Sequence, residues 1–585
     1  MPRLASRIVA LLALPLGVAP LFAACSDAAS PTGSASSAAS GTTTATTTAT
    51  SGTGGSGGSG GAGGQGGTGG MAPDPSALCK DQGLPIRPFA EGPYGTHRGE
   101  LADDFTLDLY DGTSFHLKDQ WSGCESYVFI PDRLPVSELD PTSVWAADKD
   151  LNALVKASPK NVHYFFVSRL TTDAMAEDSL KAQQGRVDLV VSKLGADADH
   201  WKARLHVVKK RAQTLGGWVQ KVFDTHGKIG FSIDRLQRVR GAGHLADVKR
   251  FSSALNSAMK WPWKSNLAYA AHDPAYFNAQ SLLQDRIDAE GATIVKLWDG
   301  ETLAEKADTM AALPSAAEMA NFDTLEVEVT QQCPDPEQIE LGNCGAWDYI
   351  ANLFLTDDEN NPIELARFIT SYHRETHWVV DASPMLTLLK SGGDHKFRWS
   401  FAPSWNTQPT ATKLALRFSK QNKPVKPTQT VYLWGGGSFG AAYNMGRMPV
   451  DVPIPQAAKK VELWTIITGH GAGTNQCSEF CNHQHEFSVN GHAYLEQFPN
   501  AGSDQSGCIS HLDNGMTPNQ AGTWWFGRGG WCPGQQVDPW VQDVTADVTP
   551  GQTATVSYRG LFKNIDPPPD GSGDIDMVSY LVISE

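Results

Sequence analysis

Between residues 100 and 300, short apolar runs alternate with longer stretches of helical composition. The runs "SYVFI", "VHYFFV" and "KIGFSID" have the length and apolar content of buried strands. Helical composition extends over 197–215 ("DADHWKARLHVVKKRAQTL") and 245–260 ("LADVKRFSSALNSAMK"). Strands that alternate with helices are typical of layered α/β folds, so this region predicts an α/β domain.

After residue 320 the pattern changes to short strands in succession, separated by turns rich in Gly, Pro, Asn and Asp. Examples are "TLEVEVT", "YIANLFL", "LALRFS", "VYLWGG", "KVELWTIIT" and "ATVSYRG". This succession is typical of an all-β sandwich or jelly roll, and its length suits two of them. The sequence therefore predicts an α/β domain followed by two all-β domains.

The N-terminus has the features of an export signal. Two arginines precede an apolar run over residues 8–24, which is too short for a membrane span. The run ends at "LFAAC", which resembles the lipobox of bacterial lipoproteins, with Cys25 as the lipidated residue. An ordinary secretory signal cleaved near Ala24 is the alternative. We expect residues 1–24 to be a lipoprotein signal peptide and the protein to be lipid-anchored in the bacterial cell envelope, at the outer membrane or cell surface.

Residues 25–78 form a low-complexity segment rich in Gly, Ser and Thr. A stretch with so few large apolar side chains cannot build a core, so we expect a disordered tether. About fifty such residues have a root-mean-square reach of roughly 40 Å. The tether would hold the folded domains away from a membrane surface.

The remaining part of the 585-residue chain, about five hundred residues, is long enough for two to four domains. The formal net charge is −16, and no stretch resembles a basic stripe, so the sequence argues against nucleic acid as a partner.

The cysteines favour disulfides. Apart from Cys25, the chain contains Cys79, Cys124, Cys333, Cys344, Cys477, Cys481, Cys508 and Cys532. An even number in an exported chain favours disulfides, although the count does not fix their connectivity. Pairing sequence neighbours gives 79–124, 333–344, 477–481 and 508–532. The segment "QCSEFCNHQHEF" (476–487) also contains two histidines, so a zinc or copper site is the alternative there.

The segment "ELADDFTLDLYDGTSFHLKDQWSGCESYVFIP" resembles the start of thioredoxin-like domains of the peroxiredoxin type. Redox-active members of that group carry a catalytic cysteine after the central strand. Here the chain continues as "VFIPDRLP", without a cysteine, whereas a thiol-redox enzyme needs an accessible cysteine of low pKa. We therefore expect residues 79–305 to be a thioredoxin-like domain that has no redox activity and serves as a spacer or an interaction domain.

Four segments in the second half resemble, in order, segments of peptide-N-glycosidase F. They are "QQCPDPEQIELGNCGAWDYIANLFL", "ARFIT", "NQCSEFCNHQHEFSVNG" and "GRGGWCPG". The resemblance runs from about residue 324 to the C-terminus. It implies two adjacent jelly rolls, expected at 315–425 and 426–585, and hydrolysis of the amide that joins an N-linked glycan to asparagine. It also implies the pairs 333–344, 477–481 and 508–532.

The resemblance assigns candidate site residues one by one. Asp348, after Trp347, matches the primary catalytic aspartate, and Glu479 matches the acid bracketed by two cysteines. Arg528 and Trp405 match substrate-side residues of the family, and Trp347 is a further substrate-contact candidate. An amide hydrolase needs an activated water and a proton for the leaving amine, and one carboxylate can supply both in turn.

Three positions depart from the family pattern. Pro403 stands where the third acid is expected, and Tyr349 replaces the arginine that follows the catalytic aspartate. His470 replaces a substrate-side tryptophan and is itself a substrate-contact candidate. The expected activity is a glycopeptide amidase without a cofactor or a metal, acting on N-linked glycans or glycopeptides.

Two other functions stay open. The loss of an acid at Pro403 favours a glycan-binding protein with an inactive site. Copper-dependent hydroxylating monooxygenases share the paired jelly rolls and use an H-x-H pair, and His483 and His485 alternate on a predicted strand so that both could face one metal. Aromatic side chains near the motifs are candidate sugar platforms: Trp405, Trp524, Trp525 and Trp531. Aromatic residues of jelly rolls are more often part of the core.

Overall fold

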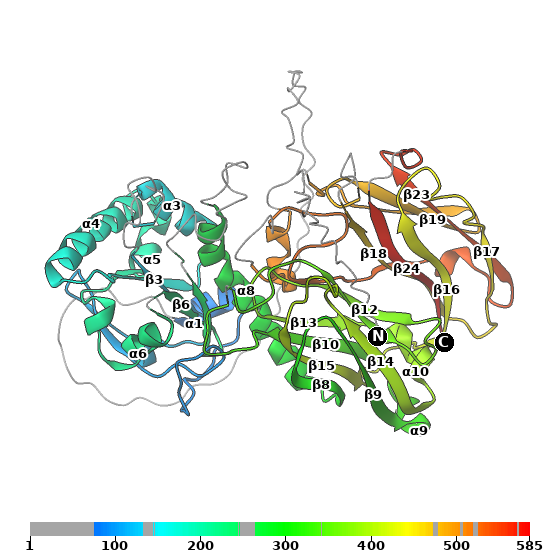
Figure 1. Ribbon diagram of the computed structural model, residues 1–585, viewed down its shortest axis with the longest axis horizontal. Coiled ribbons are helices and arrows are strands. Elements are labelled where there is room, and N and C mark those ends of the chain that lie inside the picture. Colours follow the sequence, from blue (N-terminus) through cyan, green and yellow to red (C-terminus); the bar gives the residue numbers. More distant parts are fainter. Residues whose placement is uncertain are drawn as a thin grey trace, which may run out of the picture. The chain divides into compact units, whose positions relative to one another are not determined.

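The computed structural model describes residues 75–132, 144–145, 147–227, 229–243, 245, 264–340, 342–471, 478–502, 507–518, 525–569 and 573–585 (Figure 1). These residues belong to one compact unit of the chain. The predicted signal peptide, Cys25 and nearly all of the predicted tether lie outside the described residues. Within the part of the chain that the structure covers, no helix is long and apolar enough to cross a membrane.

A five-stranded mixed sheet lies at the centre of the first part of the structure. Its order is β5-β4-β3-β6-β7, with β3 (Ser126–Pro131), β4 (Val162–Val167), β5 (Leu205–Val207), β6 (Gly230–Ile233) and β7 (Val239–Gly243). The first three strands run parallel, whereas β6 is antiparallel to β3 and β7 to β6. Every residue of β3 and β4 is buried, which explains their nearly continuous apolar runs.

Helices cover both faces of this sheet. On one face α3 (Asp148–Ala157) and α4 (Asp173–Val191) pack against Val128, and on the other α6 (Gly217–Thr225) packs against Phe129. Successive strand residues point to opposite faces, so neighbours in β3 join different clusters. The smaller elements are α1 (Pro75–Asp81), β1 (Thr106–Asp108), β2 (Ser114–His116), α2 (Leu117–Gln120) and α5 (Ala198–Lys202). The predicted α/β arrangement is confirmed.

The helix predicted over 197–215 is wrong for most of its length. Helix α5 ends at Lys202, and the chain then forms β5, which pairs with β4. Leu205 and Val207 are both buried in this strand. Tertiary burial of the apolar run therefore outweighs the helix propensity of its charged neighbours. Of the second predicted helix, 245–260, only the first residue lies among the described residues.

The long helix α8 (Lys264–Ala289) connects the mixed sheet to the β-rich part. Gln280 Nε2 donates a hydrogen bond of 3.0 Å to the carbonyl of His377. Tyr276 packs in one cluster with Leu512 and Trp525, far along the chain. The helix is thus tied to both halves of the β-rich part.

The first β-sandwich contains two antiparallel sheets, β13-β10-β15-β8 and β21-β12-β11-β14-β9. Its elements are β8 (Thr293–Leu303), β9 (Lys306–Ser315), α9 (Ala316–Met319), β10 (Thr324–Gln332), β11 (Ile350–Leu355), β12 (Ile363–Ile369), β13 (Thr376–Asp381), α10 (Leu386–Leu389), β14 (Gly392–Ser400), β15 (Thr410–Ser419) and β21 (Gln535–Gln536). Strand β8 pairs with β15 and β9 with β14, so the sandwich begins before residue 315, where the sequence placed its start. Few residues of β8 and β9 are buried, and their apolar residues do not alternate, so a search for apolar alternation did not find these strands.

The second β-sandwich has the sheets β16-β24-β18-β22 and β17-β23-β19-β20. Its strands are β16 (Pro427–Ser438), β17 (Val450–Pro453), β18 (Lys460–His470), β19 (His483–Val489), β20 (His492–Gln497), β22 (Trp540–Asp543), β23 (Thr553–Phe562) and β24 (Asp574–Ser584). Each of the six strands predicted after residue 320 lies within an observed strand or overlaps most of one. Together the two sandwiches confirm the jelly-roll-type β architecture.

The two sandwiches share one hydrophobic core. Phe368 and Trp399 of the first belong to the same buried cluster as Trp464 and Tyr580 of the second. The guanidinium of Arg367 in β12 donates 2.7 Å hydrogen bonds to Thr468 Oγ1 and to the carbonyl of Asp576. Strand β21 comes from late in the sequence but pairs with β12. This continuous packing fixes the junction at which the candidate site lies.

Three of the four predicted disulfides are present in the structure. They are Cys79–Cys124, Cys333–Cys344 and Cys508–Cys532, with Cα–Cα distances of 5.5, 4.5 and 5.6 Å. Pairing of sequence neighbours is confirmed for these six cysteines. Cys477 lies outside the described residues, so its bond to Cys481 stays a prediction.

Candidate active site

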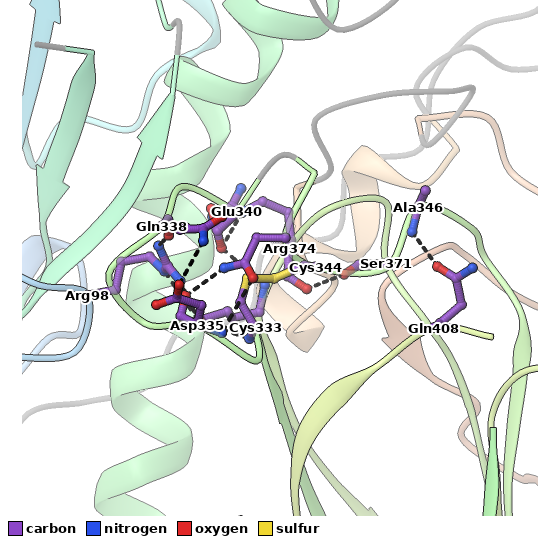
Figure 2. Close-up of a disulfide and its surroundings, with 12 residues drawn as sticks. Arg98, Cys333, Asp335, Gln338, Glu340, Cys344, Ala346, Ser371, Arg374 and Gln408 are labelled. Carbon is purple, nitrogen blue, oxygen red and sulfur yellow. Dashed lines mark hydrogen bonds and ion pairs between the residues drawn. A yellow bond between two sulfur atoms is a disulfide. The ribbon is translucent and has the colours of Figure 1, made fainter. Parts of the chain in front are cut away.

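Asp348 lies at the rim of the first sandwich, two residues before β11, and its backbone is held on both sides. Thr370 Oγ1 donates to the carbonyl of Trp347 at 2.6 Å and accepts from the backbone N–H of Tyr349 at 2.8 Å. The N–H of Ala346 donates to Gln408 Oε1 at 2.6 Å (Figure 2). These bonds fix the backbone on both sides of Asp348.

Glu479 lies in the second sandwich, between β18 and β19. Its carbonyl accepts a 2.7 Å hydrogen bond from Gly529 N–H, and the carbonyl of Gly529 accepts one of 2.8 Å from Gly469 N–H. A Cβ on Gly469 would lie 1.8 Å from the carbonyl oxygen of Ser478. Glycine is therefore required here for the close approach of the two backbones.

Arg528 joins the two candidate acids. Its Nη2 lies 3.4 Å from Asp348 Oδ2 and its Nε 3.3 Å from Glu479 Oε1. The arginine side chain is 1% exposed, whereas those of Asp348 and Glu479 are 16% and 18% exposed. Its Nη1 donates to the carbonyl of Phe526 at 2.9 Å. The cation is thus buried and fixed, while both carboxylates remain reachable from solvent.

Burial and the arginine act in opposite directions on the two acids. Burial raises the pKa of Asp348, and the charge of Arg528 and a hydrogen bond from the Tyr372 hydroxyl lower it in part. Burial likewise raises the pKa of Glu479, which Arg528 lowers and the neighbouring Asp348 raises. A carboxylate whose pKa is raised is a better proton acceptor and donor near neutral pH.

Tyr372 is a site residue that the sequence did not indicate. It lies just after β12, and its hydroxyl is hydrogen-bonded to Asp348. Burial raises the pKa of this phenol well above its usual value, so it remains a donor. No local motif marks the residue, because its partner is 24 positions earlier in the chain.

Two of the tryptophans that are substrate-contact candidates are exposed. Trp405 is 79% exposed and Trp347 49% exposed. The ring of Tyr349 meets the Trp405 ring edge-on at 6.3 Å, and Asn406 Nδ2 donates to the Tyr349 hydroxyl at 2.6 Å. The cavity beside this segment has a volume of about 20 Å³, enough for one water molecule. Both tryptophan rings are therefore more open to solvent than this cavity.

Of the other aromatic candidates, Trp531 packs against Arg528. Trp531 is 7% exposed, and the Arg528 guanidinium lies 4.8 Å from its ring centre. His470 stacks on Trp531 at 4.9 Å, and burial lowers the pKa of His470 well below its usual value. Trp525 belongs to the buried cluster beneath α8, as expected of a core residue. Trp524 lies outside the described residues.

The two histidines of the copper hypothesis bind each other. His483 Nδ1 lies 2.7 Å from His485 Nε2, and His485 Nδ1 lies 2.7 Å from the Tyr558 hydroxyl. Both imidazoles are fully buried. The two histidines face the same side of β19, as predicted. There they form a chain of hydrogen bonds with Tyr558. Among the described residues, one group has three possible metal ligands within 4.8 Å of one another, and two of its members form the Cys333–Cys344 disulfide.

Comparison with known proteins agrees with the resemblance found in the sequence. Residues 438–583 match the family described as peptide-N-glycosidase F, C terminal. This part of the chain is similar to peptide-N-glycosidase F. A relative from Elizabethkingia miricola, peptide-N(4)-(N-acetyl-beta-D-glucosaminyl)asparagine amidase F, is 23% identical over 296 residues, 46% of this chain and 78% of the relative. The predicted resemblance of the C-terminal half to peptide-N-glycosidase F is confirmed.

Solved structures with some similarity include PNGase F, a glycosylasparaginase from Flavobacterium meningosepticum. That chain is 19% identical, with a TM-score of 0.41, and the match covers 51% of this chain and 96% of the other. A second structure, PNGF-II, is 14% identical with a TM-score of 0.38 and matches 52% of this chain and 67% of its own.

Proposed function

We propose that the protein hydrolyses the amide bond that joins an N-linked glycan to asparagine, with Asp348 as the catalytic acid/base. The observation that carries this proposal is the meeting of Asp348 and Glu479, from two sandwiches, at the buried Arg528. The family match over 438–583 and the amidase relative support it. The substrates are N-linked glycopeptides or glycoproteins, and the reaction requires no cofactor.

In this reaction water adds to the carbonyl carbon of the asparagine side chain, and the carbon–nitrogen bond breaks. The products are an aspartate carboxyl group and a glycosylamine. Asp348 accepts the proton of the attacking water and returns it to the leaving nitrogen. Its raised pKa suits both steps, because the same group has to gain and lose a proton near neutral pH.

The neighbouring side chains position the reactants. Glu479 orients the water or a sugar hydroxyl, and Arg528 favours the ionised form of both acids. The Tyr372 hydroxyl fixes the rotation of the Asp348 carboxylate. Trp347 and Trp405 offer flat apolar faces on which sugar rings can lie.

A glycan-binding protein with an inactive site is the second candidate. It is favoured by Pro403, whose carbonyl accepts the 3.0 Å hydrogen bond of a turn and which brings no carboxylate to the site. Incubation of the purified protein with an N-glycopeptide separates the two functions. Mass spectrometry should detect the released glycan and the conversion of asparagine to aspartate. Binding without release would establish the glycan-binding function instead.

We further propose that the amidase is a lipoprotein of the cell envelope. The signal segment 1–24, the lipobox at Cys25 and the tether 25–78 support this. Replacement of Cys25 by Ser should release the protein from the membrane fraction. The first domain would be a thioredoxin-like α/β domain that begins at about 79 and ends before β8, supported by its mixed five-stranded sheet. The two jelly rolls would end at about 425 and 585.

A further inference from the structure

We propose that the α/β part of the chain positions the candidate catalytic aspartate. Arg98 and Asp273, both from the α/β side, hold the disulfide loop (residues 333–344) and Arg374 in place, and through these the segment that carries Asp348. The inference rests on the proposed amidase function and gives the α/β domain a task in it. Arg98, Asp273 and Arg374 are positioning residues, since none of them touches the reacting atoms.

Arg98 fixes the middle of the disulfide loop (Figure 2). Its side chain is 3% exposed, and Nη1 donates to the carbonyl of Gln338, while Nη2 donates to the carbonyl of Asp335 at 3.4 Å. The same guanidinium forms an ion pair with Glu375 at 3.2 Å. Ile339, next to Gln338, packs against the hydrophobic cluster of the α/β sheet. The loop is therefore anchored in the α/β part by polar and apolar contacts.

Arg374 is the second connection. Its Nη1 lies 3.2 Å from Asp273 Oδ1 in α8, and its Nε lies 3.1 Å from Glu340 Oε2 in the disulfide loop. Nη1 also donates to the carbonyl of Pro518 at 2.7 Å. All three charged side chains are at most 3% exposed. One guanidinium thus joins α8, the disulfide loop and a segment of the chain that follows the second sandwich's β20.

Both connections lead directly to Asp348. Cys344 closes the disulfide loop four residues before it, and the carbonyl of Gly345 accepts a 2.7 Å hydrogen bond from His373 N–H. Arg374 is two residues after Tyr372, whose hydroxyl binds Asp348. His373, between them, has φ of 55°, a left-handed conformation that is uncommon for a residue with a side chain. We call Arg98, Asp273 and Arg374, with the contacts described above, the clamp. The clamp fixes the backbone before Asp348 and the Tyr372 hydroxyl that contacts the Asp348 carboxylate.

These contacts are better suited to fixing the geometry of the loop and of Arg374 than to stabilising the fold. Buried ion pairs add little net stability, because removal of both charges from water costs about as much as their attraction returns. Planar guanidinium groups that donate to several carbonyls at once do, however, fix geometry. A carboxylate displaced by about 1 Å can lower the rate of a reaction roughly a hundredfold.

The test uses the full chain and three variants. Arg98→Gln removes the cation, Arg98→Lys keeps the charge but not the planar fork, and Arg98→Gln/Glu375→Gln removes both charges of the ion pair together. Arg559→Gln is the matched control, because Arg559 forms an exposed ion pair with Asp566, far from this cluster in the sequence. The measurements are kcat and KM on an N-glycopeptide, the melting temperature, and hydrogen exchange of the backbone amides of residues 345–350.

We expect the double variant to melt close to the wild type, yet to exchange residues 345–350 faster. Its kcat should fall about ten- to a hundredfold, with KM changed less than about threefold. Arg98→Lys should recover part of the rate, and Arg559→Gln should match the wild type. Unchanged exchange and unchanged kcat in both Arg98→Gln variants would overturn the clamp.

The two proposals fail in different ways. A wild type that releases no glycan would overturn the amidase function. The exchange measurement would then still decide the clamp, because it reports the order of the 345–350 backbone without any turnover. Faster exchange at 345–350 in the double variant would support the clamp, and unchanged exchange would remove it.

Discussion

Arg528 Nη2 lies 3.4 Å from Asp348 Oδ2, although the two residues are 180 positions apart in the chain. The aspartate comes from the first sandwich and the arginine from the second. The two residues meet because the two sandwiches share one hydrophobic core, to which each sandwich contributes large buried side chains. The site therefore belongs to the pair of sandwiches and would not form in either one alone.

Asp348→Asn should abolish glycan release and leave glycopeptide binding within about threefold of the wild type. Asparagine keeps the size and most hydrogen bonds of aspartate but cannot accept the proton of water, so the loss falls on kcat and amounts to about a hundredfold or more. Glycan release followed by mass spectrometry and binding by calorimetry measure the two effects. Glu479→Gln, in contrast, should weaken binding and turnover together. Wild-type release by Asp348→Asn would show that another group is the base.

Arg528→Gln should move the rising limb of the kcat–pH profile to higher pH. The charge of Arg528 lowers the pKa of both Asp348 and Glu479, and without it burial raises each pKa further. A base acts only when ionised, so its active form would appear later as the pH increases. Arg528→Lys keeps the charge and should move the limb less. An unchanged limb in Arg528→Gln would mean that neither acid controls the rate.

The two candidate acids and their arginine could be proposed from local motifs in the sequence. Asp348, Glu479 and Arg528 each lie beside a cysteine or tryptophan in a short recognisable segment, and the structure brings all three together. Tyr372 could not be predicted, because its contact with Asp348 depends on how β12 and the W-D segment are placed in space. Arg98 and Arg374 were missed for the same reason: their partners are 277 and 101 positions away.

The strands that could be predicted from the sequence are those with a regular burial pattern. The fully buried β3 and β4 were found, as were alternating strands such as β10. The start of the first sandwich was not, because β8 and β9 are largely exposed and their apolar residues do not alternate. The strand β5 was read as helix, because three residues carry too short a pattern to compete with charged neighbours of high helix propensity.

Cys124→Ser should lower the free energy of unfolding by about 2–5 kcal/mol without changing any thiol chemistry. Cys124 is fully buried and bonded to Cys79 across 45 positions, so its loss frees a long loop in the unfolded chain. Denaturant titration measures the stability, and a peroxidase assay measures the chemistry. Peroxide turnover by the wild type that disappears in Cys124→Ser would show that the α/β domain is a redox enzyme after all.

Trp405→Ala should weaken glycopeptide binding about tenfold while leaving the melting temperature almost unchanged. The side chain is 79% exposed and touches the Tyr349 ring at its edge, so its removal takes away a sugar-facing surface and little core.

Trp531→Ala is the matched variant. That ring is 7% exposed and lies against Arg528 and His470, so its loss should cost about 3–5 kcal/mol of stability. Calorimetry with a glycopeptide measures binding, and thermal melts measure the stability of both variants. Together they distinguish a sugar-binding side chain from one that stabilises the core. If Trp405→Ala binds as the wild type does, the sugar lies elsewhere, and the exposed Trp347 becomes the next side chain to replace.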